Sequence, residues 1–174
     1  MIENNKPNNS SPEAFERLVN SVKVKLYKTG MAILKNDDDV CDAIQETLLS
    51  AYKNFSSLNH EEYFATWITR ILINKCYDII KKNKKVAYLN EKMEVEEDAA
   101  YYDRYKEEST VERVLNEIDP DLKLVTVLFY YDGFSVKEIS EMINIPEGTV
   151  KSRLSRARDK MYVILKKEEG EYIG

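Results

Sequence analysis

The chain has 174 residues, of which 33% are charged and 43% hydrophobic, with only five glycines and four prolines. This composition favours one ordinary helical domain or two small ones, and argues against a β-sandwich or a disordered chain. The net charge is −5, no apolar run approaches the ~18 residues of a membrane span, and the polar N-terminus lacks a signal-peptide core. We therefore expect a cytoplasmic protein without membrane insertion.

The residues that most often build metal or nucleophilic sites are scarce. Cys41 and Cys76 belong to no CxxC pair, and His60 is the single histidine. We therefore expect no metal, no cofactor and no enzymatic activity. Both cysteines are expected to pack as small apolar residues.

The first predicted helix begins at Ser11, a capping residue followed by Pro12 in the first turn. Its apolar stripe consists of Phe15, Leu18, Val19, Val22 and Leu26. Gly30 either ends this helix or allows another helix to pack closely, and the pattern does not decide between the two.

A second helix is expected to open at residues 37–39, because three aspartates suit the positive end of a helix dipole. One of its faces is apolar, and the opposite face is acidic. This opposite face is either an ordinary solvated surface or a docking surface for a basic partner. It carries Asp39, Asp42 and Glu46, with Gln45 at its edge.

After a loop at residues 55–62, a long helix is predicted from about Glu62 to Lys82. Besides its core stripe, this helix has a face with aromatic and polar groups at spacings of three and four. Such a face suits single-stranded nucleic acid, because bases stack on rings and cations meet phosphates. The alternative is that the two aromatic rings complete the core. The face carries Trp67, Arg70, Asn74, Tyr77 and Lys81.

Residues 86–110 lose the helical rhythm and become acidic and tyrosine-rich, and residues 89–112 carry a net charge of −6. We interpret them as a linker. A second domain follows, with a short helix from Val111 to Ile118 and another that starts at Asp119 and ends at Gly133.

Residues 134–158 form a predicted helix–turn–helix. Ser135 and Glu138 have capping-box spacing, Asn144 tolerates a left-handed backbone, and a second helix restarts near Glu147. Residues 133–167 carry a net charge of +4, with arginines and lysines on both shoulders of the second helix. This pattern predicts DNA binding. The expected seam is Val150, Leu154, Ala157, Met161 and Leu165.

The whole pattern resembles the extracytoplasmic-function group of bacterial RNA polymerase sigma factors. The resemblance rests on residues 42–47 (DAIQET), 66–74 (TWITRILIN) and 145–158 (IPEGTVKSRLSRAR). It implies an all-α fold with two small helical domains, 11–86 and 111–168, joined by an acidic flexible linker, 87–110, the C-terminal domain being a helix–turn–helix. Asn144 stands where the family usually has glycine, and Ala43 where it has a larger aliphatic residue.

The resemblance also implies a dissociable subunit that directs core polymerase to specific promoters and assists melting. Docking to the β′ clamp helices would use Asp39, Asp42, Ala43, Ile44, Gln45 and Glu46. The −10 element and its opened strand would meet Asn59, Trp67, Arg70, Asn74, Lys75 and Lys81. The −35 element would meet Glu147, Thr149, Lys151, Ser152, Arg153, Ser155, Arg156 and Arg158.

The implied partners are core RNA polymerase, including its β flap, promoter DNA and an anti-sigma factor. Three alternatives remain open on the residues alone. One is a free-standing helix–turn–helix regulator that binds DNA without polymerase. Another is an enzyme that uses Cys41 or Cys76 with His60. The third is a sigma factor that has lost melting activity.

Overall fold

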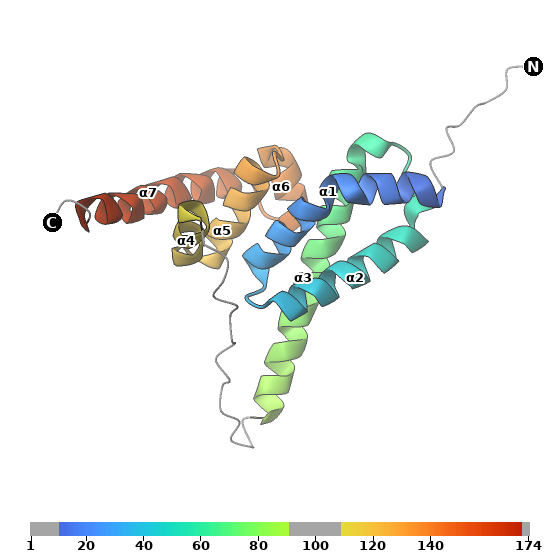
Figure 1. The fold of residues 1–174 in the computed structure, drawn as a ribbon, viewed down its shortest axis with the longest axis horizontal. Helices are drawn as coiled ribbons and strands as arrows, with labels where there is room; N and C mark the ends of the chain where they lie inside the picture. Colours follow the sequence, from blue (N-terminus) through green and yellow to red (C-terminus); the bar gives the residue numbers. More distant parts are fainter. Residues whose placement is uncertain (1–10, 91–108, 172–174) are drawn as a thin grey trace, which may run out of the picture. The chain divides into compact units, whose positions relative to one another are not determined.

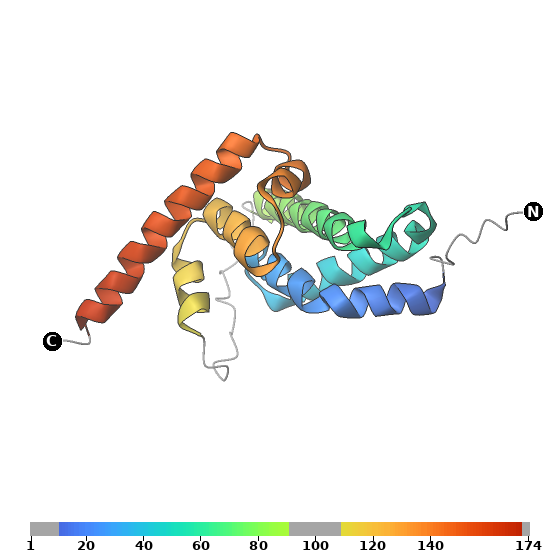
Figure 2. The ribbon, with the colours of Figure 1, turned by 90° about the horizontal axis from the view of Figure 1, so that it is seen from above.

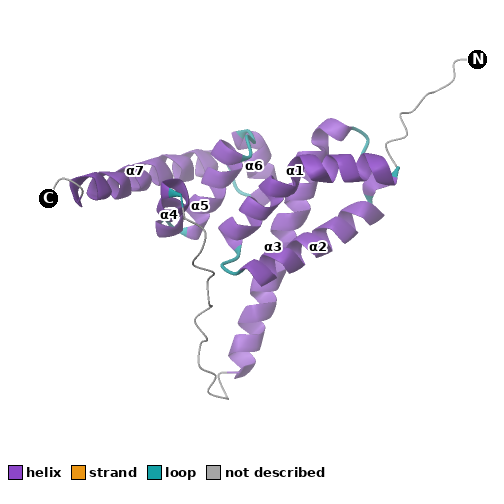
Figure 3. Ribbon diagram, viewed as in Figure 1, coloured by secondary structure: helices purple, strands orange, loops and turns teal. Residues whose placement is uncertain are grey.

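The computed structural model describes residues 11–90 and 109–171, and every regular element in these ranges is a helix (Figures 1 and 3). The chain divides into two compact units, the first ending at Ile80 and the second beginning at Lys81. The predicted all-α fold is therefore confirmed. None of the helices in these two ranges is both long and apolar enough to cross a membrane.

Helix α1 (Pro12–Ile33) begins as predicted, because the Ser11 hydroxyl accepts a hydrogen bond from the Ala14 amide at 3.2 Å. The helix continues past Gly30. A Cβ atom at this position would lie 2.9 Å from Cγ1 of the buried Val40. Gly30 therefore serves close packing between α1 and the next helix, which settles the choice that the sequence left open.

Helix α2 (Asp37–Lys53) and helix α3 (Phe64–Asn90) as far as Ile80 complete the first unit. The short 3₁₀ helices η1 (Phe55–Ser57) and η2 (Glu61–Tyr63) lie between them. α1 and α2 pack against each other, and the apolar face of α3 closes the core. The buried core residues are Leu18, Val22, Leu26, Leu34, Val40, Ala43, Ala51, Phe55, Phe64, Ile68, Leu72 and Cys76.

One predicted helix end in this region was wrong. α3 does not end near Lys82 but continues to Asn90, because residues 81–90 contain no glycine or proline and lysines are good helix formers. The first residues of the predicted linker, 87–90, are therefore helical. Its remaining acidic stretch, 91–108, lies outside the described residues, and the predicted ranges of the two domains and the linker stay predictions.

The second unit contains α4 (Thr110–Glu117), α5 (Pro120–Thr126), the π-helix η3 (Val127–Tyr131), α6 (Val136–Ile143) and α7 (Glu147–Glu171). α4, α5 and α6 all pack on α7, which is the red helix in Figure 2. The backbone turns between η3 and α6 at Gly133, whose φ of 82° is left-handed as predicted.

Candidate nucleic-acid interface

The predicted helix–turn–helix is present and its caps are confirmed. The Ser135 hydroxyl accepts from the Glu138 amide at 3.2 Å, and the Glu138 carboxylate accepts from the Ser135 amide at 2.8 Å. α6 then ends at Asn144, whose φ of 53° and ψ of 51° are left-handed. α7 restarts within three residues, and the Val150 amide donates to the Pro146 carbonyl at 3.1 Å. The turn is therefore specified locally, by residues that sequence alone identifies.

The seam of α7 follows the prediction for three turns and then departs from it. Val150, Leu154 and Ala157 are buried, and Met161 is half-buried. The next contact is made by Ile164 rather than Leu165, whose exposure is 41%. On a helix, the seam residue that follows Met161 can lie either three or four positions further along the chain. The residue three positions further on makes the contact here, because it packs against the apolar residues of α4 and α5.

Basic residues on one shoulder of α7 are engaged within the unit. An Nη atom of Arg153 lies 2.6 Å from the Asp121 carboxylate, and the Arg153 side chain is 21% exposed. Lys160 donates in the same way to Asp119, the residue before α5. This contact, followed by the positive charge of Lys160, holds the pKa of the Asp119 carboxyl below its usual range. Arg153 and Lys160 therefore attach α7 to the N-terminal turn of α5.

The rest of the exposed surface of α7 carries polar groups that face outward. Most of the predicted −35 residues are here, and Thr149 is half-buried. Arg158 donates to the Tyr130 hydroxyl at 3.2 Å, and the Tyr130 side chain is 54% exposed. Sequence reasoning missed Asp119, Asp121 and Tyr130, because no local pattern reveals partners 28 to 41 residues away. The exposed residues of the predicted set are Glu147, Lys151, Ser152, Ser155, Arg156 and Arg158.

The predicted docking face of α2 is smaller than expected. Asp42, Gln45 and Glu46 are exposed, but Ala43 is fully buried and Ile44 packs against the core. Ala43 cannot present its side chain to a partner, so its assignment to the contact set was wrong, whereas Ile44 is only partly buried and its assignment stays a prediction.

Asp39 is also partly engaged in the fold. Its carboxylate accepts from the Asn36 side-chain amide at 2.8 Å, and its backbone amide donates to the Asn36 side-chain carbonyl at 2.7 Å. This reciprocal pair caps α2. Leu49, which the sequence analysis did not include, is 63% exposed on the same helix. One further turn of the 3.6-residue period places it beside Gln45 and Glu46.

The mixed face of α3 contains one ring that packs on the core and several exposed polar groups. Trp67 is half-buried against the core, with its ring 6.0 Å from that of Phe64, so it completes the packing while one side stays accessible. Arg70, Asn74 and Lys81 are exposed, as is Asn59 in the preceding loop. Tyr77 is 39% exposed on the same helix.

Lys75 differs from the other basic residues of this set. Its ammonium group lies 3.0 Å from the Glu46 carboxylate, so an ion pair joins the docking face of α2 to α3. The Lys75 side chain is 31% exposed and that of Glu46 is 66% exposed. The two sets of predicted contact residues therefore meet at this pair.

The two cysteines behave differently from each other. Cys76 is buried, and this burial raises the pKa of its thiol to about 12, so the reactive thiolate is disfavoured at neutral pH. Cys41 is exposed, which corrects the expectation that it packs in the core. Within residues 11–90 and 109–171, no group of three or more His, Cys, Asp or Glu side chains is arranged to hold a metal ion.

Two family models match the chain, and they coincide with these surfaces. Sigma-70 region 2 matches residues 18–86, and Sigma-70 region 4 matches residues 109–161. The ECF RNA polymerase sigma factor SigW of Bacillus subtilis is 30% identical over 161 residues, covering 84% of this chain and 86% of SigW. The chain belongs to the extracytoplasmic-function sigma factors.

Other relatives agree with this family. The ECF RNA polymerase sigma factor SigM of Mycobacterium tuberculosis is 27% identical over 154 residues, covering 87% of this chain and 77% of SigM. Among solved structures, a similar fold occurs in the sigma factor RpoE of Bartonella quintana in complex with the anti-sigma factor NepR. That likeness has a TM-score of 0.73 at 24% identity and covers 88% of this chain and 98% of the other.

As a sigma factor, the protein is a regulatory subunit that binds core RNA polymerase and directs it to promoters. The helix–turn–helix of the second unit is the DNA-binding part of region 4. The family thus accounts for a chain in which a local basic segment coexists with a net charge of −5.

Proposed function

We propose that this sigma factor reads promoters with two separate surfaces while a third attaches it to the polymerase. The observation that carries the proposal is the presence of exposed polar helix faces on both compact units. The face of α2 made of Asp42, Gln45 and Glu46, which we extend to Leu49, would dock on the β′ clamp helices. An acidic rim around one apolar side chain is suited to a basic helical partner.

The α3 surface and the loop before it would engage the −10 element after the duplex opens. Trp67 offers a ring edge, Arg70 and Lys81 offer cations for the backbone, and Asn59 and Asn74 offer hydrogen bonds to bases. Melting would be driven by binding energy for the unpaired strand. No nucleotide-binding GxxxxGK[ST] motif occurs in the sequence.

The outward face of α7 would read the −35 element, with Arg156 and Lys151 as the leading cations. Each surface alone would bind DNA weakly, and docking to polymerase would couple them through effective concentration. This arrangement would also explain why a weak basic patch suffices. The β flap of the polymerase is the proposed partner of the second unit.

We further propose an anti-sigma factor as the regulator, acting in the cytoplasm where polymerase and promoters are found. Support comes from two similar solved structures, the complex of RpoE with the anti-sigma factor NepR and the complex of CnrH with the cytosolic domain of CnrY. We propose no catalytic centre in the chain itself, and the buried thiol of Cys76 is consistent with that.

Run-off transcription with purified core polymerase tests the proposal. Specific initiation is expected only when the protein is added, on promoters selected from genomic DNA by the holoenzyme. Tight specific binding to the same promoters without polymerase would instead identify a free-standing helix–turn–helix regulator. Core binding without opening of the duplex would identify a sigma factor that has lost melting.

The docking face is tested by Asp42→Lys. Reversing an exposed charge in an acidic face should weaken core polymerase affinity by roughly ten- to a hundredfold, because like charges in an interface repel. Glu16→Lys, which changes net charge equally at an exposed site on α1, is the matched control. Equal affinities for both variants would show that α2 does not dock through this face.

A further inference from the structure

The loop between α2 and α3 is fixed at its first end by apolar packing. Phe55 is 4% exposed, and its ring lies 5.1 Å from that of Phe15 on α1, edge to face. Leu58 also packs against the core. The amides of Ser57 and Leu58 donate to the carbonyls of Asn54 and Phe55, both at 3.0 Å. The chain therefore has a defined path up to Leu58.

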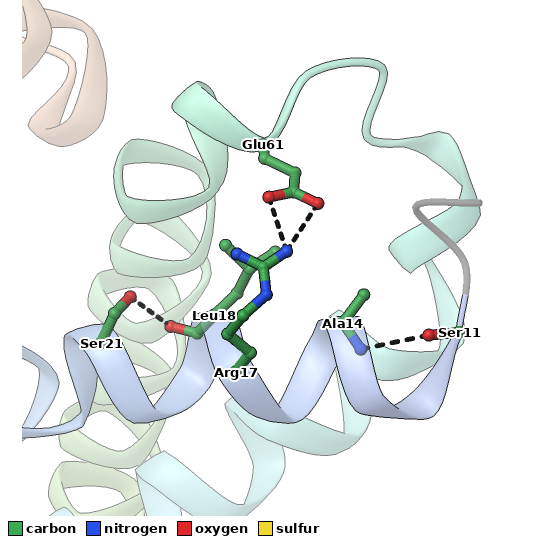
Figure 4. A network of polar contacts seen from close by, with 6 residues as sticks. All are labelled: Ser11, Ala14, Arg17, Leu18, Ser21 and Glu61. Carbon is green, nitrogen blue, oxygen red and sulfur yellow. Dashed lines mark hydrogen bonds and ion pairs between the residues drawn. The ribbon is translucent and has the colours of Figure 1, made fainter. Parts of the chain in front are cut away.

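The second end of the loop is fixed by an ion pair to the same helix. One Nη atom of Arg17 contacts both oxygens of the Glu61 carboxylate, at 2.9 and 2.8 Å, as Figure 4 shows. Arg17 lies two residues after Phe15, so neighbouring positions of α1 hold both ends of the loop. The start of α1 is itself secured by the Ser11 cap, drawn in the same view. The loop is thus held from one rigid element.

Between the two anchors only Asn59 and His60 remain, and both are exposed. The His60 ring lies 5.9 Å from the Tyr63 ring, edge to face, and the Tyr63 amide donates to the His60 carbonyl at 3.2 Å. The tip is therefore a two-residue projection on a constrained base. A site on such a base loses less conformational entropy on binding than a site on an unrestrained loop.

We propose that Arg17 is a positioning residue for promoter recognition, which holds the Asn59–His60 tip in the conformation that accepts an unpaired base of the −10 element. This inference rests on the proposed role of the loop. Arg17 itself is not a DNA contact in this proposal, because its guanidinium is committed to Glu61. It acts through the backbone that joins Glu61 to His60.

The exposure of the pair determines where its effect will be seen. The side chains of Arg17 and Glu61 are 62% and 31% exposed, so the pair contributes little to global stability. Its loss should leave the unit folded and change the order of the tip. The effect is therefore expected in base discrimination rather than in the melting temperature.

The experiment uses the holoenzyme and promoters that carry each of the four bases at each unpaired −10 position. Arg17→Gln should lower discrimination at the captured base by roughly two- to tenfold, the cost of immobilising one or two side chains on binding. Core affinity and the melting temperature should stay unchanged. The charge-swapped double variant Arg17→Glu with Glu61→Arg should recover most of the discrimination, while each single reversal lowers it.

Lys23→Gln is the matched control, since Lys23 is an exposed cation on α1 whose recorded partner is Asn20 of the same helix. A tip variant, Asn59→Ala with His60→Ala, separates the positioning role of Arg17 from the role of the loop itself. Discrimination lost in the tip variant but retained in Arg17→Gln would overturn the positioning role alone. Discrimination retained in the tip variant would overturn the proposed role of the loop and this inference with it.

Discussion

The two helices proposed to read DNA are held in place by different forces. α3 is embedded through Phe64, Ile68, Leu72 and Cys76, each no more than 1% exposed. The buried seam of α7 consists of Val150, Leu154 and Ala157, and ion pairs from its shoulder to α5 supplement it. Apolar burial is not subject to charge screening, whereas exposed ion pairs are screened by salt.

This difference changes how the basic residues are counted. On α7, Arg153 and Lys160 complete the packing of the unit, so the net charge of the segment overstates what it can offer to phosphates. On α3, the ion pair of Lys75 reaches Glu46 on the docking face, while Arg70 and Lys81 remain exposed. A basic residue on either helix can therefore contact DNA only where the fold leaves its charged group exposed to solvent.

The largest expected effect concerns the apolar attachment of α3. Leu72→Ala removes a fully buried side chain and should lower the free energy of unfolding of the first unit by about 2–5 kcal/mol. Labelling of Cys76 by a thiol reagent, followed by peptide mass analysis, measures this unfolding, because the buried thiol becomes accessible only when the unit unfolds. Leu49→Ala, at 63% exposure, should change the same free energy by less than about 0.5 kcal/mol. Equal effects would show that α3 is not held by this core.

A matched pair of arginines on α7 tests the distinction between reading and packing. Arg156→Ala should weaken −35 binding by about 1–3 kcal/mol and shift base preference, if its exposed guanidinium contacts a base edge. Arg153→Ala should leave the preference unchanged and lower the stability of the second unit by at most about 1 kcal/mol, because its pair with Asp121 is partly exposed. The measurements are competition binding of holoenzyme to promoters varied at −35, and denaturant unfolding. A preference shift in Arg153→Ala would assign that residue to the DNA.

The smallest expected effect is the pH dependence of the stability that the ion pair between Lys160 and Asp119 contributes. The pKa of Asp119 is lowered by the hydrogen bond from Lys160, so the folded state favours the carboxylate. The resulting stability is present above the ordinary pKa of an aspartate and is lost as the pH falls through the lowered pKa. Lys160→Met should remove this acid-sensitive part, whereas Lys167→Met should not. Unfolding measured from neutral pH down to strongly acidic pH, at low and high salt, checks both; identical curves for the two variants would exclude the pair.

Local structure was predictable because its causes lie within a few residues. The Ser11 cap, the capping box of Ser135 and Glu138, and the left-handed Asn144 each depend on hydrogen bonds or sterics within one turn. The family resemblance rested on such short motifs, and the family is confirmed. The assignment of individual contact residues stays a prediction, apart from Ala43, whose side chain is fully buried.

The errors had both local and tertiary causes. The helix predicted to end near Lys82 continues to Asn90, because residues 81–90 contain no glycine or proline that would stop it. The π-helix η3, in which Val127 and Leu128 are buried, was not predicted from the sequence. The exposure of Cys41 depends on the side from which α1 and α3 cover α2.

By itself the sequence determined the helices, their caps, the turn of the helix–turn–helix and the family, because periodicity and capping act over short distances. Only the tertiary structure decided which side chains of those helices are available. Gly30 proved to be a contact point for Val40, Arg153 a partner of Asp121, and Arg17 an anchor for Glu61. Each pairing joins separate elements, and an interaction that forms only when helices pack leaves no trace in the order of neighbouring residues.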